Sequence, residues 1–313
     1  MRIFLIVNPS ASSVTPRTRV VIQRALATTH DLTVGETARR GHATRLAQGA
    51  VVDGFDAVVV LGGDGTLNEA ANGLAGSGVP LGALPGGSTN VFARTVGYSN
   101  DPVTAVGELL DAIADGDRRS IGLGNANGRY FLFHVGIGFD AAVVEHVERR
   151  ASLKRYAGHP FFVWSTLLTW ARWGERREPR FAVHIPRPDG GTDDVDGYLT
   201  ICLNSNPYTF LGNRPFNVAP GLTFEKGFSV LTLRSLGMPT FLGVVASALM
   251  SGRHLTRHPR ADFRSDVREL TVTGHGKFPY QLDGDYLGDV ERLVLRHVPD
   301  VLHIYAPAEP PSR

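Results

Sequence analysis

The chain has 313 residues, of which 42% are hydrophobic and 20% charged, and its formal net charge is +2. That length accommodates two domains, and so small a net charge argues against nucleic acid as a partner. The single cysteine, Cys202, excludes an internal disulfide and a zinc site made of cysteines.

The first part of the chain alternates short β-branched runs with helical patterns. Strands are expected at residues 2–7, 32–36, 56–61, 80–84 and 118–123, and helices at residues 16–29, 41–52, 66–75, 89–95 and 102–114. Strands that alternate with helices indicate a doubly wound parallel sheet. We therefore expect residues 1–124 to form an α/β domain.

The pattern changes after a turn-forming cluster at residues 124–128. Strands are expected at residues 130–135, 181–185, 197–203, 228–233, 269–273 and 293–298, and helices at residues 141–150, 161–170 and 240–250. Strands without a helix after each predict a β-rich, antiparallel, sandwich-like domain over residues 125–306. Residues 307–313 are expected to be a C-terminal tail.

No segment has the length of a membrane span. The longest apolar stretch, residues 161–170, is about half of the ~20 residues that a span needs. Residues 1–7 are apolar but too short for the core of a signal peptide. We therefore expect a cytoplasmic protein that meets a membrane only peripherally, at its inner face.

Three small, polar loops follow expected strands: residues 8–13 (NPSASS), 62–66 (GGDGT) and 85–90 (PGGSTN). Ligands bind at the carboxyl ends of parallel strands, glycine lets the backbone approach a phosphate, and the amides at a helix start favour an anion. Each loop alone would more often be a plain loop, but together they predict one phosphate-binding edge. None of them matches a Walker loop or the Gly-x-Gly-x-x-Gly dinucleotide fingerprint.

The helix after the central loop carries a capping signal. Thr66 is followed three residues later by Glu69, which is the spacing of a capping box. We expect Thr66 to cap this helix and Glu69 to complete the box.

Five motifs in this order resemble the catalytic domain of bacterial diacylglycerol kinases, sphingosine kinases and ceramide kinases. They are NPSA at 8–11, Glu36-Thr37 with GHA at 41–43, GGDGTLNEAANGL at 62–74, LPGGSTNVFART at 84–95, and LDGD at 282–285. The resemblance covers nearly the whole chain. GGDGT alone is shared with NAD kinases and, loosely, with phosphofructokinases, so the ordered set is the more specific signal.

The resemblance implies a lipid kinase with an N-terminal domain of the NAD kinase and phosphofructokinase type. It implies ATP with Mg²⁺ bound between the two domains, and transfer of the γ-phosphate to a lipid hydroxyl, with diacylglycerol and phosphatidic acid as the leading substrate and product. No separate metal site is expected. The residues expected to contact the nucleotide are Asn8, Pro9, Ser10, Ala11, Ser12, Thr37, Gly62, Gly63, Asp64, Gly65, Thr66, Leu67, Asn68, Glu69, Gly87 and Ser88.

The resemblance also implies the catalytic acids. The family's Asp-Gly-Glu triplet, whose glutamate is the base, corresponds here to Asp283-Gly284-Asp285. Phosphoryl transfer needs a group that accepts the alcohol's proton, so Asp285 is the expected base. Asp283 is expected to orient it or to bind the metal-bridged phosphates, and Asp64 to organise Mg²⁺. Without the resemblance, the triplet would be interpreted as a β-turn.

The chain departs from the family pattern at positions that bear on function. Asp285 is one methylene shorter than glutamate, which shortens its reach by about 1.5 Å. Ser88 replaces a threonine and Val91 an aspartate. Where several bacterial members hold a structural Mg²⁺ with an Asp-Gly pair, this chain has Lys226-Gly227. Because lysine cannot bind Mg²⁺, we expect that site to be absent and the Lys226 ammonium to replace the cation.

The expected partner is a lipid substrate at the membrane surface, and an exposed sheet edge would allow two copies to pair as a homodimer. Trp164, Trp170 and Trp173 fall in one window flanked by arginines. That pattern fits either an interfacial helix on an anionic membrane or a core helix.

Two other functions remain open from the sequence. A kinase for a soluble substrate, such as NAD, would share GGDGT but would not explain PGGSTN, the Asp-Gly-Asp triplet or the tryptophan window. A non-catalytic regulator that binds nucleotide or lipid would be consistent with the shortened acid at Asp285 and with Lys226.

Overall fold

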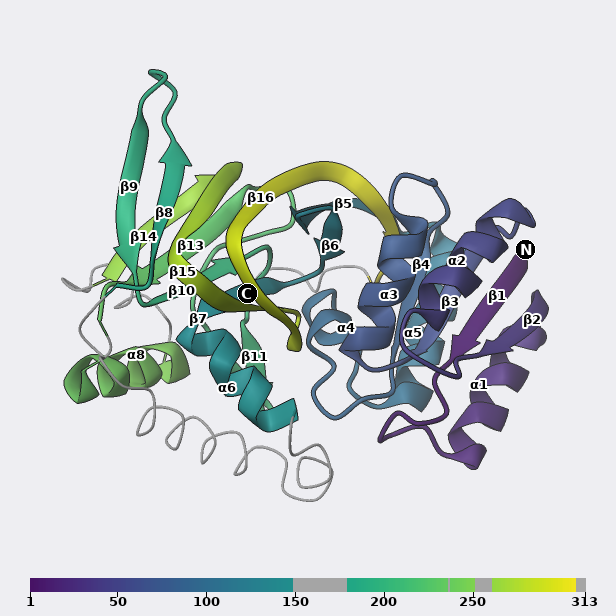
Figure 1. Cartoon of the computed structure of the whole chain (residues 1–313). Coiled ribbons are helices and arrows are strands. Elements are labelled where there is room, and N and C mark those ends of the chain that lie inside the picture. Colours follow the sequence, from purple (N-terminus) through teal and green to yellow (C-terminus); the bar gives the residue numbers. More distant parts are fainter. Residues whose placement is uncertain (149–178, 236, 251–260, 308–313) are drawn as a thin grey trace. The chain divides into compact units, whose positions relative to one another are not determined.

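The computed structural model describes residues 1–148, 179–235, 237–250 and 261–307. The chain divides into two compact units (Figure 1): unit 1 comprises Met1–Leu123 and Pro299–Arg313, and unit 2 comprises Gly124–Val298. The chain passes between the units within strands β5 (Arg118–Ala126) and β16 (Asp285–Tyr305). The expected helix at residues 161–170, with all of the tryptophans, lies outside the described residues.

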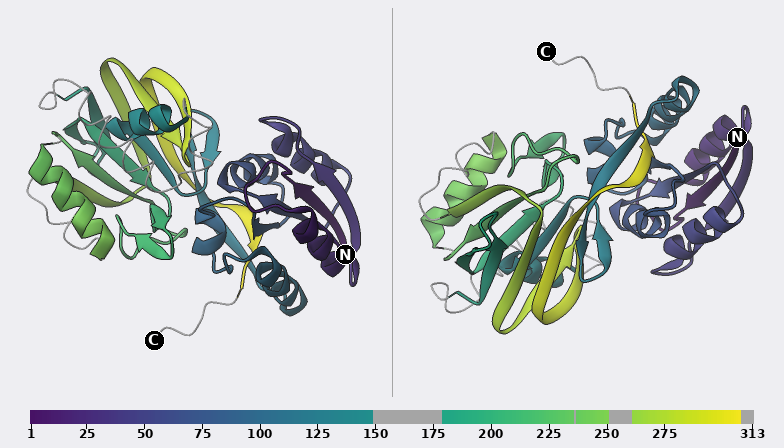
Figure 2. Two further views of the ribbon diagram at one scale, coloured as in Figure 1. Left: turned by 90° about the horizontal axis from the view of Figure 1, so that it is seen from below. Right: turned by 90° about the horizontal axis from the view of Figure 1, so that it is seen from above.

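Unit 1 contains a parallel sheet with helices on both faces (Figures 1 and 2). The strand order is β4 (Leu81–Pro85), β3 (Ala57–Gly62), β1 (Arg2–Val7) and β2 (Asp31–Glu36). The helices are α1 (Pro16–Ala27), α2 (His42–Val52), α3 (Asp64–Leu74), α4 (Val91–Thr95) and α5 (Pro102–Asp115). Helix α1 packs against α5 and α2 against α3. Strand β3 is buried along its whole length, as expected for a strand covered on both faces.

Local sequence explains where two of these helices begin. Thr15 accepts a hydrogen bond from the backbone N–H of Thr18 and precedes a proline at the first position of α1. The Asp101 side chain likewise accepts a hydrogen bond from the backbone N–H of Thr104, and it precedes the proline at the first position of α5. A capping oxygen followed by proline is a typical helix start, which is why the sequence placed these starts correctly.

The end of the chain returns to unit 1, which differs from the expected domain over residues 125–306. Ile304 and Tyr305 pair in parallel with Leu81 and Gly82 of β4, and the Tyr98 hydroxyl donates to the Tyr305 carbonyl oxygen (2.7 Å). The end of β16 therefore extends the sheet of unit 1. Sequence alone could not show this, because an apolar run does not state which strand it pairs with.

Unit 2 is built on an antiparallel sheet, so the expected fold class is confirmed for both units. The main strand order is β14 (Ala261–Val267), β13 (Phe228–Leu233), β10 (Leu199–Leu203), β7 (His134–Gly138), β15 (Glu269–Leu282) and β16. Strand β8 (Phe181–Pro186) joins β15 to β9 (Thr192–Gly197), β6 (Arg129–Phe131) pairs with β5, and β11 (Thr209–Leu211) pairs with β12 (Arg214–Phe216). The described helices are α6 (Phe139–Glu148) and α8 (Met238–Met250).

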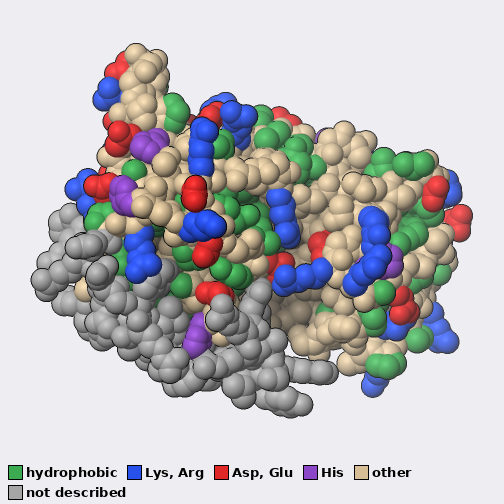
Figure 3. Space-filling view, viewed as in Figure 1, with side chains coloured by type: hydrophobic (Ala, Val, Ile, Leu, Met, Phe, Trp, Pro, Cys, Tyr) green, Lys and Arg blue, Asp and Glu red, His purple; other side chains and the backbone are tan. Residues whose placement is uncertain are grey.

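Aromatic side chains dominate the main core of unit 2. Phe131, Phe181, Phe228 and Phe278 are each fully buried, and two of their ring pairs lie 5.5 and 5.6 Å apart. On the surface, Lys and Arg side chains are interspersed with Asp and Glu over the visible face of this unit (Figure 3).

Several strands of unit 2 differ from their predicted ranges. The short strands expected at residues 269–273 and 293–298 belong to the much longer β15 and β16, and β9, β11, β12 and β14 were not predicted. The strand expected at residues 130–135 is divided into β6 and β7. Within the part of the chain that is described, no helix is both long and apolar enough to span a bilayer.

Candidate functional site

The three polar loops of unit 1 meet at the carboxyl ends of β1, β3 and β4. The Asn8 N–H donates to the Leu61 carbonyl oxygen (3.0 Å). The Gly86 N–H donates to the Gly62 carbonyl oxygen (2.8 Å), and the Ser13 N–H donates to the Gly86 carbonyl oxygen (2.8 Å). These backbone bonds connect the loop at 8–13, the loop at 62–66 and the loop at 85–90 to one another. The structure therefore brings together the loops that the sequence predicted as one edge.

Side chains reinforce the contact between the first two loops. The Asn8 amide donates to the Thr66 hydroxyl (2.9 Å), and the Asn8 side-chain oxygen accepts from the Ser10 N–H (3.0 Å). Ser10 and Ser12 are exposed, whereas Leu67 is fully buried. Of the residues expected to contact a nucleotide, these serines of the first loop thus face solvent, while Leu67 packs in the core.

Glycine is required where the second and third loops touch. A Cβ atom on Gly86 would lie 2.9 Å from the Cα and N atoms of Gly62, and one on Gly87 would lie 2.8 Å from the Cα of Gly63. Such distances are shorter than real Cβ contacts, so any side chain would push the loops apart. The result is a cradle of backbone at the strand ends, which fits the phosphate groups of a nucleotide.

Asp64 lies in this cradle, and the start of helix α4 holds its carboxylate. Its Oδ2 accepts the Val91 N–H and its Oδ1 accepts the Phe92 N–H, each at 3.0 Å. A carboxylate at a helix N-terminus is electrostatically favourable. Asp64 is the one carboxylate in the three loops, so a Mg²⁺ ion held there would take further ligands from phosphate and water.

The expected capping box at Thr66 and Glu69 is wrong. Helix α3 begins at Asp64, and no side chain caps it through Gly63. The Glu69 carboxylate instead accepts the backbone N–H groups of Gly41 (2.7 Å) and Ala43 (3.1 Å). It therefore caps the neighbouring helix α2, because α3 starts two residues earlier than expected and packs against α2. Local spacing carried no signal for this contact.

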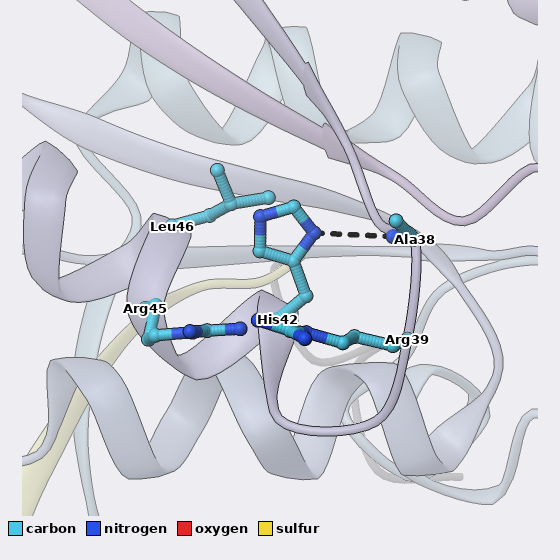
Figure 4. Close-up of a pocket in the computed structure, with 5 residues that line it drawn as sticks. All are labelled: Ala38, Arg39, His42, Arg45 and Leu46. Carbon is cyan, nitrogen blue, oxygen red and sulfur yellow. Dashed lines mark hydrogen bonds between the residues drawn. The ribbon is translucent and has the colours of Figure 1, made fainter.

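A hollow of about 490 Å³ lies beside the start of α2 (Figure 4). The first residue of its lining, Ala38, is the residue that follows Thr37. Its lining includes Arg39, His42 and Arg45, and the His42 Nδ1 accepts the Ala38 N–H (3.1 Å). Two guanidinium groups suit an anionic or π-rich ligand. Neither arginine was predicted, although the run of basic residues at 39–45 was a possible signal.

In unit 2, the first two residues of the Asp-Gly-Asp triplet form the two-residue turn between β15 and β16, and Asp285 begins β16. Leu282 pairs with Asp285, and Asp283 (φ 49°) and Gly284 (φ 84°) are both left-handed. Two such residues make a type I′ hairpin turn, for which Asp-Gly is a preferred sequence. The turn interpretation and a functional role for Asp285 are thus compatible.

The Asp283 carboxylate is buried and holds the segment between β6 and β7. It accepts the N–H groups of Leu132 (2.7 Å), Phe133 (2.9 Å) and His134 (3.0 Å), and Asp283 is only 7% exposed. Three donors stabilise the ionised form. This contact explains why the expected strand at 130–135 is interrupted, and sequence reasoning did not include it.

Asp285 follows the turn and remains accessible. Its side chain is 28% exposed, and its Oδ2 lies 3.9 Å from the Arg129 guanidinium, which is the outer limit of an ion pair. A partly exposed carboxylate is chemically able to accept the proton of an alcohol.

Lys226 lies in the loop where the family pattern has a metal-binding aspartate. Its ammonium group donates to the Gly221 carbonyl oxygen (3.3 Å), the kind of oxygen that a cation binds. Among the residues that the structure describes, no three or more His, Cys, Asp or Glu side chains are arranged to hold a metal ion. Replacement of a cation by Lys226 stays a prediction.

Comparison with known proteins identifies relatives across both units. The model of the diacylglycerol kinase catalytic domain matches residues 2–126, which contain the three loops. The chain is 33% identical over 274 residues to a diacylglycerol kinase of Bacillus subtilis (strain 168), covering 86% of this chain and 84% of that protein. It is 31% identical over 232 residues to a protein of Pseudomonas fluorescens named "Probable lipid kinase YegS-like", covering 67% and 75%.

Two solved structures show the same fold. A diacylglycerol kinase structure from Bacillus anthracis str. Sterne superposes with a TM-score of 0.71 at 20% identity, covering 97% of this chain and 96% of that chain. An NAD kinase from Archaeoglobus fulgidus, in complex with ATP, has a TM-score of 0.55 at 11% identity, covering 99% and 95%. At these identities the likeness concerns the fold alone.

Proposed function

This chain belongs to the diacylglycerol kinase family of lipid kinases, and we propose that it transfers the γ-phosphate of ATP to the hydroxyl of diacylglycerol, giving phosphatidic acid. The observation that carries this proposal is the glycine contact between two loops at the strand ends, where any Cβ would come within 2.9 Å of the opposite backbone. Glycine keeps this backbone free of side chains at the strand ends, where backbone N–H groups can approach a phosphate closely.

Unit 1 is assigned the nucleotide. The loops at 8–13, 62–66 and 85–90 surround the triphosphate in this proposal, and Ser88, which is exposed, supplies a hydroxyl. Asp64 is placed by the α4 amides to receive a Mg²⁺ ion that arrives with the nucleotide. When bound, the metal neutralises charge on the phosphates.

Unit 2 is assigned the base. The acceptor hydroxyl oxygen forms a bond to the γ-phosphorus, the bond from that phosphorus to the bridging oxygen of ADP breaks, and the hydroxyl proton passes to Asp285. The type I′ turn places Asp285 at the start of β16, opposite Leu282 of β15, and the Asp285 side chain is 28% exposed. The aspartate reaches about 1.5 Å less far than glutamate, so the acceptor must approach the turn closely.

The lipid acceptor also implies where the protein acts. Diacylglycerol lies in the membrane with its hydroxyl at the surface, so we propose peripheral contact with the inner face of the membrane. A kinase for a soluble substrate is the second candidate, because an NAD kinase shares the fold. Two relatives above 30% identity are named as a diacylglycerol kinase and a probable lipid kinase, which favours the lipid.

The deciding experiment follows labelled γ-phosphate from ATP and Mg²⁺ into diacylglycerol in mixed micelles. Total bacterial lipid extract and NAD serve as parallel acceptors, and Asp285→Asn as the matched variant. We expect label in phosphatidic acid, lost in the variant. Label in another lipid of the extract would correct the substrate but keep the lipid kinase. Label in NAD would replace the proposal by the soluble kinase, and label in no acceptor would favour a non-catalytic regulator.

A further inference from the structure

A chain of hydrogen bonds in unit 2 connects helix α6 to the turn that precedes Asp285. The Gln281 amide nitrogen donates to the Asp140 Oδ2 (2.8 Å), and the Gln281 side-chain oxygen accepts the Gly284 N–H (2.8 Å). The Tyr208 hydroxyl donates to the other oxygen of Asp140 (2.8 Å). Gln281 is fully buried. The connection joins residues that lie far apart in the sequence.

The neighbouring strand leaves space for this pair. Gly136 of β7 lies opposite Gln281 in the sheet, and a Cβ atom there would lie 1.6 Å from the Asp140 Oδ2 and 2.5 Å from the Gln281 amide nitrogen. No side chain could be accommodated at position 136 without displacing one of the two. The glycine is thus an independent feature of the fold that fits the Asp140–Gln281 contact.

The chemistry of the groups defines the direction of each bond. Both oxygens of Asp140 accept hydrogen bonds, from a hydroxyl and from an amide, as an ionised carboxylate does. Burial raises the pKa of Asp140, and the bonds from Gln281 and Tyr208 oppose that rise. Because the Gln281 nitrogen must face the carboxylate, its oxygen must face the Gly284 N–H. The carboxylate therefore dictates the orientation of the amide that holds the turn.

The turn is consequently fastened on both sides. The Asp283 carboxylate binds the N–H groups of residues 132–134, and the Gly284 N–H binds Gln281. Asp285 follows directly and contributes to neither contact. A shift of the turn would move its carboxylate, and a misplacement of about 1 Å can lower a rate by about 10²-fold.

We propose that Asp140 and Gln281 are positioning residues, which act through the Gly284 N–H to set the place of the Asp285 carboxylate. This inference rests on the proposed function, in which Asp285 is the base. The two side chains touch the turn and each other and need not contact the lipid or the nucleotide. Their effect is therefore expected in kcat and not in the KM for ATP.

A swap of the two functional groups provides the test. Asp140→Asn replaces one of two acceptor oxygens by an amide nitrogen, so the Gln281 amide and the Tyr208 hydroxyl can no longer both donate to residue 140. Gln281→Glu places a carboxylate against the carboxylate of Asp140. Each single variant therefore loses at least one hydrogen bond of the network. The double variant Asp140→Asn with Gln281→Glu restores all three hydrogen bonds, since the carboxylate now at position 281 would accept both from the amide now at position 140 and from the Gly284 N–H.

Two readouts are measured on all four proteins: kcat and KM with lipid and ATP, and the hydrogen exchange rate of the Gly284 amide. We expect each single variant to lose about 10²-fold in kcat with an unchanged KM for ATP, and to exchange the amide faster. The double variant should regain most of the wild-type kcat and most of the protection of the Gly284 amide from exchange. The control Thr232→Val removes a buried hydroxyl contact with Thr200 (3.0 Å) in the same unit and should lower stability without changing kcat.

Single variants with wild-type kcat, or a double variant no better than the worse single variant, would overturn the inference. If the wild type phosphorylates no lipid, the proposed function fails, and the exchange rates decide separately whether the pair holds the turn. Restored protection of Gly284 in the double variant would then support the positioning contact, and its absence would overturn it.

Discussion

Unit 1 assembles its loops mainly from backbone contacts, whereas unit 2 holds its turn with buried side chains. In unit 1, three loops adjacent to parallel strands meet through N–H to carbonyl bonds and through glycines with no room for a Cβ. In unit 2, the Asp283 carboxylate accepts the N–H of the distant Leu132, and the Gln281 amide links Gly284 to the distant Asp140. The loops of unit 1 should thus be most sensitive to changes of glycine, whereas the turn of unit 2 depends on its buried side chains as well as on Gly136 and Gly284.

The largest expected effect tests whether the turn of unit 2 carries the chemistry. Asp285→Asn removes the proton acceptor but keeps the side chain's shape, so we expect kcat to fall by about 10²–10⁴-fold while the KM for ATP stays nearly constant. Steady-state kinetics measure both. The control Asp289→Asn alters an exposed carboxylate of the same strand, bonded to the Tyr286 hydroxyl (2.9 Å), and should keep wild-type kcat. An active Asp285→Asn enzyme would contradict the assignment.

The second prediction concerns the pH dependence of stability that a buried histidine of unit 2 should cause. His134 is 4% exposed, its Nδ1 has no hydrogen-bond partner among the described residues, and burial lowers its pKa from 6.5 to about 3. Between these values the unfolded chain binds a proton that the folded chain does not. The free energy of unfolding should therefore fall as pH falls from 6.5 toward 3, by up to about 1.4 kcal/mol per pH unit.

Urea unfolding at a series of pH values measures this slope. His134→Phe should remove that part of the slope, since a phenyl ring takes up no proton. The control His275→Gln changes a side chain that is 58% exposed and should keep the wild-type slope. Equal slopes in wild type and His134→Phe would mean that His134 is protonated in the folded state.

The third prediction disturbs the backbone cradle of unit 1. Gly87→Ala forces a Cβ to within 2.8 Å of the Gly63 Cα, so we expect a loss of about 1–3 kcal/mol in the free energy of unfolding and weaker binding of ATP. Gly107→Ala is the control, because no atom lies within 4 Å of the added Cβ, and alanine in helix α5 should raise stability by up to about 1 kcal/mol. Urea unfolding and ATP titration are measured on both variants. Wild-type ATP affinity in Gly87→Ala would exclude the backbone cradle as the binding site of ATP.

The smallest effect concerns the loop where Lys226 takes the place of a metal ligand. Its bond to the Gly221 carbonyl oxygen is exposed, so Lys226→Met should lower the free energy of unfolding by less than about 1 kcal/mol. Addition of Mg²⁺ without nucleotide should leave the unfolding temperature of the wild type unchanged. A clear rise with Mg²⁺ would show that a cation binds despite the lysine.

The comparison also explains which parts of the site were predictable. Loops that follow strands in unit 1 carry their signal locally, because glycine, proline and small polar residues must sit at adjacent positions to form them. The capping box at Thr66 and Glu69 failed because a neighbouring helix in space competed for the same carboxylate. Arg39 and Arg45 were missed, since a run of basic residues does not by itself distinguish an arginine that lines a hollow from one in open solvent.

In unit 2, the sequence showed the Asp-Gly-Asp turn but not what holds it. Asp283 lies about 150 positions from the amides that it binds, and Gln281 lies 141 positions from Asp140. Periodicity and turn chemistry act over a few residues, so they carry no information about such pairs. Strand pairing could not be predicted for the same reason, as the pairing of residues 304 and 305 with β4 shows.

The sequence by itself determined the class of each unit, the order of the elements in unit 1, and the loops and turn that resemble a lipid kinase. These follow from hydrophobic period and from residues that only certain backbone conformations accept. Only the tertiary structure decided that Asp64 and Glu69 serve neighbouring helices, that the chain's end extends the first sheet, and that Asp140 and Gln281 hold the turn before Asp285. Those contacts are made between segments far apart in the chain, and folding alone brings them within hydrogen-bonding distance.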